Sequence, residues 1–266
     1  MKKTFGKVMA LGLAVVLAAG MLTGCGKKEE KTFTVGFDAE FPPYGYRDDN
    51  GEYVGFDLDL AAEVCKRNDW TLVKQPIDWD AKDMELSSGT IDCIWNGFTI
   101  NGRENEYTWS TPYIDNSQVV VVASDAGIGA LADLAGKVVA VQKDSSALAA
   151  LNDEENEANI ALRDSFAELI EYADYNTAFM DLEQGAVDAV AIDIGVADYQ
   201  IEKREAGAFV KLDELLATEQ YGVGFLLGNE ELRNTVQKSL DEMAADGTFA
   251  TIAEKWGLTD SVCLGK

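Results

Sequence analysis

Strands and helices alternate along the chain after residue 32, and this alternation limits the fold more than any other feature. The predicted elements, in order, are a strand over residues 33–37, a helix over 57–68, a strand over 71–77, a helix over 82–88 and a strand over 91–95. Asp57 is placed to cap the first helix, and Gly89 ends the second. The order strand, helix, strand predicts a parallel, doubly wound α/β sheet.

The same pattern restarts after an apolar run at 119–123 and indicates a second α/β unit. Its predicted elements are a strand over 137–142, a helix over 146–151, a strand–helix region over 164–174, a helix over 176–183 and a strand over 186–192. Residues 229–256 are mostly helical with a break at Gly247, and Asn50-Gly51 predicts a hairpin turn near the start. We therefore expect two α/β lobes with a cleft between them.

Several polar and aromatic residues follow the predicted strands of the first unit. Asp38, Trp79 and the pair Asn96-Gly97 each come just after a strand. Because ligands of open α/β sheets bind beyond the carboxyl ends of the strands, we expect these residues to share one rim of a binding site.

The N-terminus predicts secretion and a lipid anchor. Lys2, Lys3 and Lys7 precede an apolar run at 8–22, which ends in Leu22-Thr23-Gly24-Cys25. We expect a signal peptide over 1–24, a lipidated Cys25 and a tether over 25–31; the alternative is an ordinary secretory signal with a chance cysteine. A membrane-spanning helix needs roughly twenty apolar residues, and this run is shorter.

The charge balance excludes several classes of partner. The chain carries 47 acidic and 22 basic residues, a net charge of −25, and the three signal lysines leave with the signal. A phosphate backbone would be repelled, so we expect no nucleic-acid partner and no electrostatic docking on anionic lipid. A charge of this size predicts a soluble monomer.

Titratable side chains suited to catalysis or metal binding are few. The chain has no histidine, which removes the commonest metal ligand and the commonest acid–base group near neutral pH. Cys65, Cys93 and Cys263 lack CxxC spacing, so zinc is not indicated and their pairing stays open. We expect no metal, no cofactor and no catalytic residue.

An ordered set of short motifs resembles the polar-amino-acid family of bacterial ABC-transporter substrate-binding proteins. The motifs are VGFD at 35–38, PPY at 42–44, GFDLDL at 55–60, SGTID at 88–92, GFTI at 97–100, STPY at 110–113, LADLAGKV at 131–138, GAVDA at 185–189 and YGVGF at 221–225. Each motif alone is weak, but together they span nearly the whole chain after the tether in the order of the family.

The resemblance implies a periplasmic-binding-protein-like fold of two doubly wound lobes joined by two crossing strands. Lobe 1 would hold residues 32–114 and 220–266, and lobe 2 residues 115–219. The implied function is to bind a free polar L-amino acid, such as glutamine or a basic residue, outside the cell membrane and to deliver it to the membrane subunits of an ABC permease. The lobes would close about a hinge over the ligand.

A zwitterionic amino acid needs a fixed cation for its carboxylate and a fixed anion for its ammonium group. Arg103 can grip a carboxylate with two parallel hydrogen bonds, and the matching arginine of the family does so. Asp193 follows an apolar strand; alone it reads as a strand-end or helix cap, but the family has an ammonium ligand here. Gly97 and Thr99, in a turn after the third strand, match the positions that complete the ammonium site.

Further positions are assigned by the resemblance. Ser145 and Ser146 open a helix whose amides attract a carboxylate, with Asp144 as a cap for that helix. Phe41 and Trp79 match aromatic rings that enclose the ligand side chain, although core packing is the alternative for Trp79. Trp95 is expected in the core or the cleft wall.

Specificity is expected around Asp38, Glu40, Lys82 and Gln142. Asp38 and Glu40 are acidic, and Gln142 is neutral where some glutamine receptors have lysine. This balance argues against acidic ligands, and Lys82 weakens the case for a basic ligand if it points into the cleft.

Two other classes of function stay open. One is a lyase or dehydratase on the same fold, with Asp38 or Glu40 as the base. The other is an adhesin or structural lipoprotein that keeps the fold and binds no small ligand.

Overall fold

The computed structural model describes residues 31–266. The predicted signal peptide, Cys25 and the tether as far as residue 30 lie outside the described residues, and Lys31 already belongs to the first strand. Within the described range, no helix combines the length and the apolar character that crossing a membrane requires.

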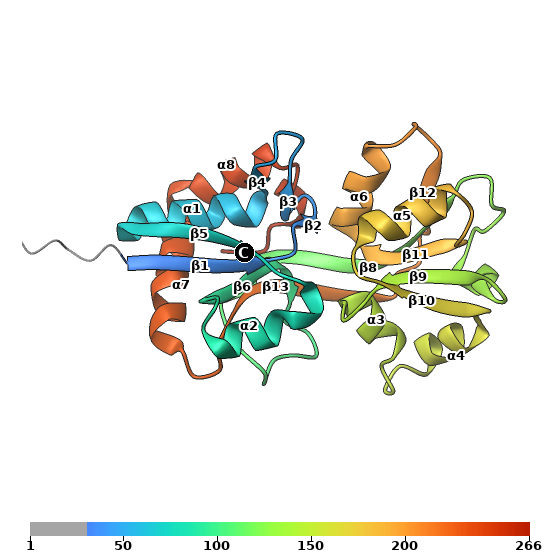
Figure 1. The fold of residues 1–266 in the computed structure, drawn as a ribbon, viewed down its shortest axis with the longest axis horizontal. Helices are drawn as coiled ribbons and strands as arrows, with labels where there is room; N and C mark the ends of the chain where they lie inside the picture. The colour runs from blue at the N-terminus through green and yellow to red at the C-terminus, as the bar shows by residue number, and fades with distance from the viewer. Residues whose placement is uncertain (1–30) are drawn as a thin grey trace, which may run out of the picture.

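One sheet of ten strands runs through the described part of the chain (Figure 1). Its main path has the order β10-β9-β11-β8-β13-β6-β1-β5, while β12 (Phe209–Lys211) pairs with β8 and β7 (Thr108–Trp109) pairs with β13. The two central strands, β8 (Ile114–Ala123) and β13 (Ala217–Phe225), pair antiparallel and run from one lobe to the other. The predicted lobe boundaries fall at these two strands and stay a prediction.

Lobe 1 contains three parallel strands, β1 (Lys31–Phe37), β5 (Trp70–Pro76) and β6 (Cys93–Thr99). Its helices are α1 (Phe56–Asn68), α2 (Lys82–Ser88), α7 (Glu230–Asp246) and α8 (Thr248–Lys255). A small antiparallel sheet of β2 (Glu40–Phe41), β3 (Gly45–Arg47) and β4 (Tyr53–Val54) confirms the predicted hairpin.

Lobe 2 repeats the architecture with the parallel strands β9 (Val138–Gln142), β10 (Glu168–Tyr172) and β11 (Ala189–Asp193). Its helices are α3 (Ser146–Leu151), α4 (Glu157–Ser165), α5 (Tyr175–Glu183) and α6 (Ile194–Glu202). The predicted strand–helix region at 164–174 is wrong in order, because helix α4 comes before strand β10. The mixed α/β class with two lobes is confirmed.

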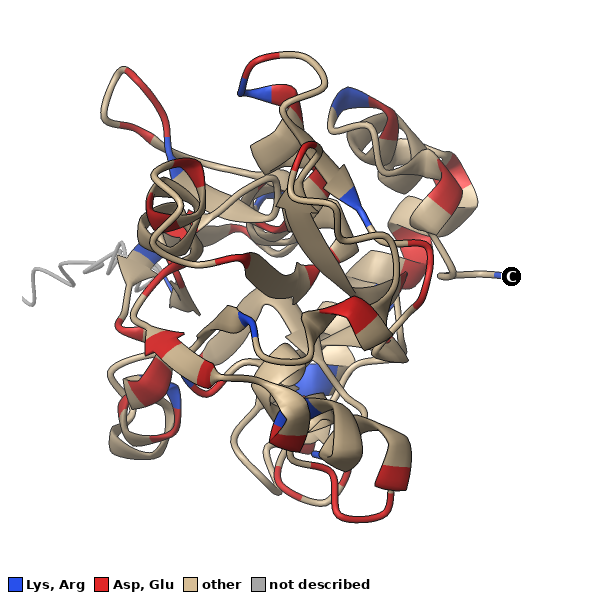
Figure 2. Cartoon of the chain, turned by 90° about the vertical axis from the view of Figure 1, so that its right-hand side faces the viewer, with Lys and Arg blue, Asp and Glu red and all other residues tan. Residues whose placement is uncertain are grey.

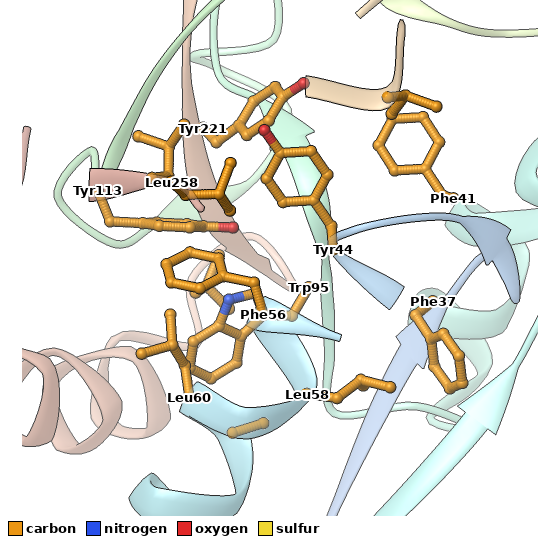
Figure 3. Close-up of a cluster of buried hydrophobic side chains, with 14 of the residues drawn as sticks. Phe37, Phe41, Tyr44, Phe56, Leu58, Leu60, Trp95, Tyr113, Tyr221 and Leu258 are labelled. Atoms are coloured by element: carbon orange, nitrogen blue, oxygen red, sulfur yellow. The ribbon is translucent and has the colours of Figure 1, made fainter. Parts of the chain in front are cut away.

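Aromatic side chains dominate the core of lobe 1 and continue toward the crossing strands (Figure 3). Phe56 packs against Tyr113 and Phe249, and Trp95 also contacts Tyr113. All four are buried, which places Trp95 in the core as expected. Each such side chain contributes roughly 1.5–3 kcal/mol on burial, so this cluster holds the base of the crossing strands in place.

The predicted cap at Asp57 is wrong. Helix α1 begins at Phe56, and its N-cap, Gly55, makes no side-chain cap hydrogen bond. The Asp57 carboxylate instead accepts hydrogen bonds from the Gly97 amide (2.6 Å) and the Tyr113 hydroxyl (2.9 Å). A buried carboxylate needs donors, and the Gly97 amide and the Tyr113 hydroxyl supply them from other parts of the fold. Burial raises the pKa of Asp57 to about 7.

The third strand is longer than the sequence pattern indicated. Strand β6 continues to Thr99, so Gly97 and Thr99 lie within the strand rather than after it. Pairing with β13 shifts register between Gly222 and Gly224, which bends the sheet beside Gly97.

The three described cysteines are free. Cys65 and Cys93 are buried, and Cys263 is partly exposed.

Candidate functional site

A narrow crevice lies where the two lobes meet. Nine residues line it: Phe41, Trp79, Asn96, Gly97, Thr99, Gln142, Ser145, Ser146 and Asp193. Eight of them are candidate site residues from the sequence, and they come from both lobes. The two remaining candidates adjoin the crevice, since Asp38 is bonded to Gln142 and Arg103 to Ser146. The space left among the lining residues is only about 10 Å³, so the lobes are in contact here.

Asp193 is held by neutral donors from the two crossing strands. Its Oδ1 atom accepts hydrogen bonds from Asn116 Nδ2 (2.9 Å), Gln118 Nε2 (2.6 Å) and the Tyr221 hydroxyl (2.5 Å). Asp193 occupies the N-cap position of helix α6 but makes no side-chain cap hydrogen bond, so its carboxylate serves the crevice instead. Burial, with a further contribution from the charge of Glu219, raises the pKa of Asp193 to about 7.

Glu219 is a second buried carboxylate at the same place. Its Oε1 atom accepts hydrogen bonds from Thr99 Oγ1 (2.9 Å), Asn116 Nδ2 (2.7 Å) and Gln118 Nε2 (2.8 Å). We call the group Asn116, Gln118, Asp193 and Glu219 the strand end of the crevice. Of this group, only Asp193 was predicted from the sequence.

Gly97 lets the backbone approach the crevice closely. Its φ angle is +58°, and a Cβ atom would lie 3.0 Å from both Phe41 and Tyr221. The Gly97 amide donates a hydrogen bond to the buried carboxylate of Asp57, which fixes the backbone of Gly97 at the crevice. Phe41 is buried and packs against Tyr44 and Tyr175, with ring centroids 5.8 and 6.1 Å apart.

Arg103 reaches from lobe 1 to lobe 2. Its Nη1 atom donates to Ser146 Oγ (3.1 Å) and to the Thr99 carbonyl (3.4 Å), and its guanidinium lies 5.5 Å from the Phe98 ring centroid. No described acidic residue forms an ion pair with Arg103, so its charge is free to bind an anion.

Ser145, not Asp144, caps helix α3. The Ser145 hydroxyl accepts from the Leu148 amide (3.2 Å). Asp144 has a φ angle of +56° and points its carboxylate across the cleft to Lys82. The predicted cap was therefore one residue early, because the turn before the helix directs Asp144 toward the other lobe.

Two reciprocal ion pairs join the lobes. Lys82 of lobe 1 pairs with Asp144 of lobe 2, and Lys143 of lobe 2 pairs with Asp80 of lobe 1 (2.5 Å). We call Asp80, Lys82, Lys143 and Asp144 the ion-pair end. Trp79 lies beside it in the short helix η1 (Trp79–Ala81), where its Nε1 donates to the Asp144 carbonyl (3.2 Å). Its ring packs edge-on against Phe98 at 5.5 Å, so Trp79 both packs and lines the crevice.

Asp38 and Gln142 connect the lobes through a buried hydrogen bond. Gln142 Nε2 donates to Asp38 Oδ2 (2.7 Å) and to the Ala173 carbonyl (3.0 Å). Burial raises the pKa of Asp38 to about 6. Glu40 accepts a hydrogen bond from Asn176, again across the lobes.

An acidic cavity of about 710 Å³ adjoins Asp38. Its acidic lining residues are Asp38, Glu40, Asp78, Asp80, Glu85, Glu171 and Asp174, with Lys143 as the basic residue among them. Acidic residues also outnumber basic ones over both lobes (Figure 2). Any ligand side chain that extends into this cavity meets a negative potential.

The residues that the sequence analysis missed at the strand end carry a period-2 signal. Asn116 and Gln118 lie two apart in β8, and Glu219 and Tyr221 lie two apart in β13. Alternate residues of a strand share a face, so polar pairs at this spacing beside an apolar run indicate a polar face turned inward.

Comparison with known proteins identifies the family of this chain. The model of the bacterial extracellular solute-binding proteins, family 3, matches residues 33–259. The chain belongs to this family. Members of the family work outside the cytoplasm, so the predicted role as an extracytoplasmic solute-binding protein is confirmed.

Three similar proteins are binding proteins with named ligands. The L-cystine-binding protein of Escherichia coli (strain K12) is 30% identical over 232 residues, which cover 86% of this chain and 84% of that protein. A substrate-binding protein of an ABC uptake transporter from Streptococcus pneumoniae with bound histidine has a TM-score of 0.79 and 34% identity, covering 85% and 92% of the two chains. The crystal structure of Tv2483 bound to L-arginine has a TM-score of 0.81 and 28% identity, covering 88% and 94%.

Proposed function

We propose that this protein binds a free L-amino acid with a polar or basic side chain between its lobes and delivers it unchanged to the membrane subunits of an ABC permease. The observation that carries the proposal is the placement of opposite charges from different lobes at one crevice. Arg103 comes from lobe 1 and Asp193 from lobe 2. Arg103 bonds to Ser146 and Thr99, and these two residues line the crevice together with Asp193.

Each charge lacks an ionic partner among the described residues and suits one end of a zwitterion. Arg103, together with Ser146, offers donors to the α-carboxylate. Asp193 and Thr99 offer oxygen atoms to the α-ammonium group beside the exposed backbone of Gly97. The Ser145 hydroxyl already accepts a hydrogen bond from the Leu148 amide as the cap of helix α3. Its assignment to the ligand site therefore depends on its place in the crevice lining.

The side-chain end of the site favours a neutral polar or basic ligand. Asp38 and Glu40 lie toward the acidic cavity, and Gln142 adds no charge. Lys82 is paired with Asp144, so its charge does not oppose a cationic ligand. The cystine, histidine and arginine named for the three similar proteins fit this class.

The magnitudes suffice for useful affinity. A hydrogen bond to a charged group contributes roughly 1.5–3 kcal/mol, and micromolar binding needs about 8 kcal/mol. Arg103 and Asp193 supply two charged contacts, and Phe41 and Trp79 add apolar burial. These contributions are of the required order after the lost freedom of the ligand is counted.

We further propose that the mature protein is a monomer held at the outer face of the bacterial cell membrane by lipid on Cys25. The lipobox at 22–25 supports the anchor, and the net charge of −25 supports a soluble, monomeric body. Globomycin sensitivity of processing, or mass spectrometry of the mature N-terminus, tests the anchor.

A thermal-shift screen of the twenty amino acids and cystine tests the binding function, followed by calorimetry on the best ligand. We expect a polar or basic amino acid to raise Tm, and recovery of the unchanged ligand by NMR after incubation. Release of a product would favour the lyase or dehydratase alternative. A flat screen would contradict the proposal and favour a structural lipoprotein.

A further inference from the structure

Asp193 and Glu219 lie side by side at the strand end. Asn116 Nδ2 is 2.9 Å from Asp193 Oδ1 and 2.7 Å from Glu219 Oε1, and Gln118 Nε2 is 2.6 and 2.8 Å from the same two atoms. Two amide groups that each touch both carboxylates hold them as neighbours. Both carboxylates are buried, with exposed fractions of 3% and 7%.

All of the described groups that donate to this pair are neutral. The amides come from β8, the Tyr221 hydroxyl from β13, and the Thr99 hydroxyl from β6. The other titratable groups that face the pair are the phenols of Tyr44 and Tyr175; burial, and after it the charge of Asp193, raises the pKa of both. Neither carboxylate forms an ion pair within residues 31–266.

Arg103 contacts Thr99, whose hydroxyl donates to Glu219, but the guanidinium bonds to other groups. It bonds to Ser146 Oγ and to the Thr99 carbonyl rather than to either carboxylate. Two buried like charges without a cation cannot both ionise at low cost. Burial and the charge of Glu219 accordingly raise the pKa of Asp193 to about 7.

We propose that Glu219 is a second specificity-determining carboxylate of this site: in the ligand-free protein its buried charge beside Asp193 keeps a proton on Asp193, and the ammonium group of the amino acid displaces that proton. The inference rests on the proposed amino-acid binding. The step exchanges one cation for another, since the O–H proton leaves to water as the ammonium enters, and no other bond changes. A ligand without the α-amine leaves the proton in place and binds weakly.

Calorimetry at pH 6 in two buffers of different ionisation enthalpy measures the exchange. We expect nearly one proton to be released per amino acid bound, and little release at pH 8, where the pair has already lost its proton. Affinity should rise with pH between about pH 5 and 7, with a limit of about tenfold per pH unit for one displaced proton.

Glu219→Gln is the deciding variant, because it keeps the size of the side chain and an acceptor for the Thr99 hydroxyl while removing the charge. We expect proton release at pH 6 to fall to less than half and the rise of affinity with pH to flatten. Asp115→Asn is the matched control, since Asp115 is an exposed acid of β8, the strand that pairs with β13, and this variant should keep the proton release of the unmodified protein.

Equal proton release by the unmodified protein and the Glu219→Gln variant would overturn the inference, as would binding with no release between pH 5 and 7. Amino-acid binding without proton release would contradict only the proton exchange. Failure to bind any amino acid would contradict the proposed function as well. Carboxyl ¹³C NMR of the ligand-free protein adds a readout without ligand. We expect the Asp193 carboxyl to titrate near pH 7, and its full ionisation below pH 5 would overturn the retained proton.

Discussion

The two ends of the crevice use charge in opposite ways. At the strand end, Asp193 and Glu219 are buried among neutral donors, and neither forms an ion pair with a residue between 31 and 266. At the ion-pair end, Lys82–Asp144 and Lys143–Asp80 satisfy one another across the lobes. Unsatisfied charge is costly inside a protein and can be relieved by a ligand, whereas charge that is already paired has little left to offer.

The difference separates recognition from closure. The strand end, together with Arg103, should determine which molecule binds, because its charged groups form no ion pair with any residue that the structure describes. The ion-pair end should determine how readily the lobes stay together, because its contacts exist between the lobes alone. The following substitutions test this division, from the largest expected effect to the smallest.

Arg103→Ala should weaken amino-acid binding by about 2–4 kcal/mol, because the ligand carboxylate would be enclosed without its charged partner. Calorimetry on the best ligand measures the loss. Arg47→Ala is the control, since Arg47 is exposed and bonds to the nearby Gly51 carbonyl. Unchanged affinity in Arg103→Ala would remove this arginine from the recognition group.

Asp193→Asn should weaken binding by about 2–3 kcal/mol, since a neutral amide replaces the partner of the ammonium group. α-Amino acids should lose far more than analogues that lack the α-amine. Asp188→Asn, a half-exposed acid before the same strand, is the control. Equal loss for ligands with and without the amine would contradict the assigned role.

The same variant has a second, ligand-free readout. The pKa of Asp193 is raised to about 7 in the folded protein, so the folded state holds more protons than the unfolded state between about pH 4 and 7. The stability of the unmodified protein should therefore fall as pH rises through this window. The Tm of Asp193→Asn relative to the unmodified protein should be higher at pH 8 than at pH 5.

Lys82→Met should weaken binding by about 1 kcal/mol, because it removes a contact between lobes and keeps the aliphatic stem beside Trp79. The loss should be similar for every ligand, which a comparison of two amino acids would reveal. Lys66→Met, at an exposed site, is the control. A change in ligand preference would move Lys82 into the recognition group.

Lys143→Ala should change affinity by less than about threefold, since its pair with Asp80 is exposed to solvent. The difference from the unmodified protein should vanish at high ionic strength. Calorimetry at two salt concentrations measures it, and a large loss that persists in salt would end the distinction between the two ends.

Sequence alone predicted the elements that local rules determine. Helix α2 ends at Gly89 in a left-handed conformation, as its glycine indicated, and α3 spans the predicted residues Ser146–Leu151. Asp57 shows the limit of these rules. It has the residue type and place of a cap, but its carboxylate is taken by the amide of Gly97, forty residues away in the chain.

Site residues were predicted where a family motif includes them. Glu219, which belongs to the site because it is buried beside Asp193, was not predicted. Arg103 and Asp193 were found by resemblance, and their ligand roles stay predictions. Glu219 was missed because its proximity to Asp193 depends on the pairing of β8 with β13. From sequence alone, a charged residue in a strand is expected to face solvent. Only the arrangement of the sheet shows that the face carrying Glu219 is covered.

The ion-pair end also limits how the halves can meet. Asp80 and Lys82 are two residues apart on one lobe, and Lys143 and Asp144 are adjacent on the other, with opposite signs facing each other. A sliding shift between the lobes would bring Lys82 toward Lys143 in one direction or Asp80 toward Asp144 in the other, and in either case like charges would repel. The charge pattern therefore favours a single alignment of the two lobes. The same four side chains that hold the closed lobes together also disfavour closure in a shifted register.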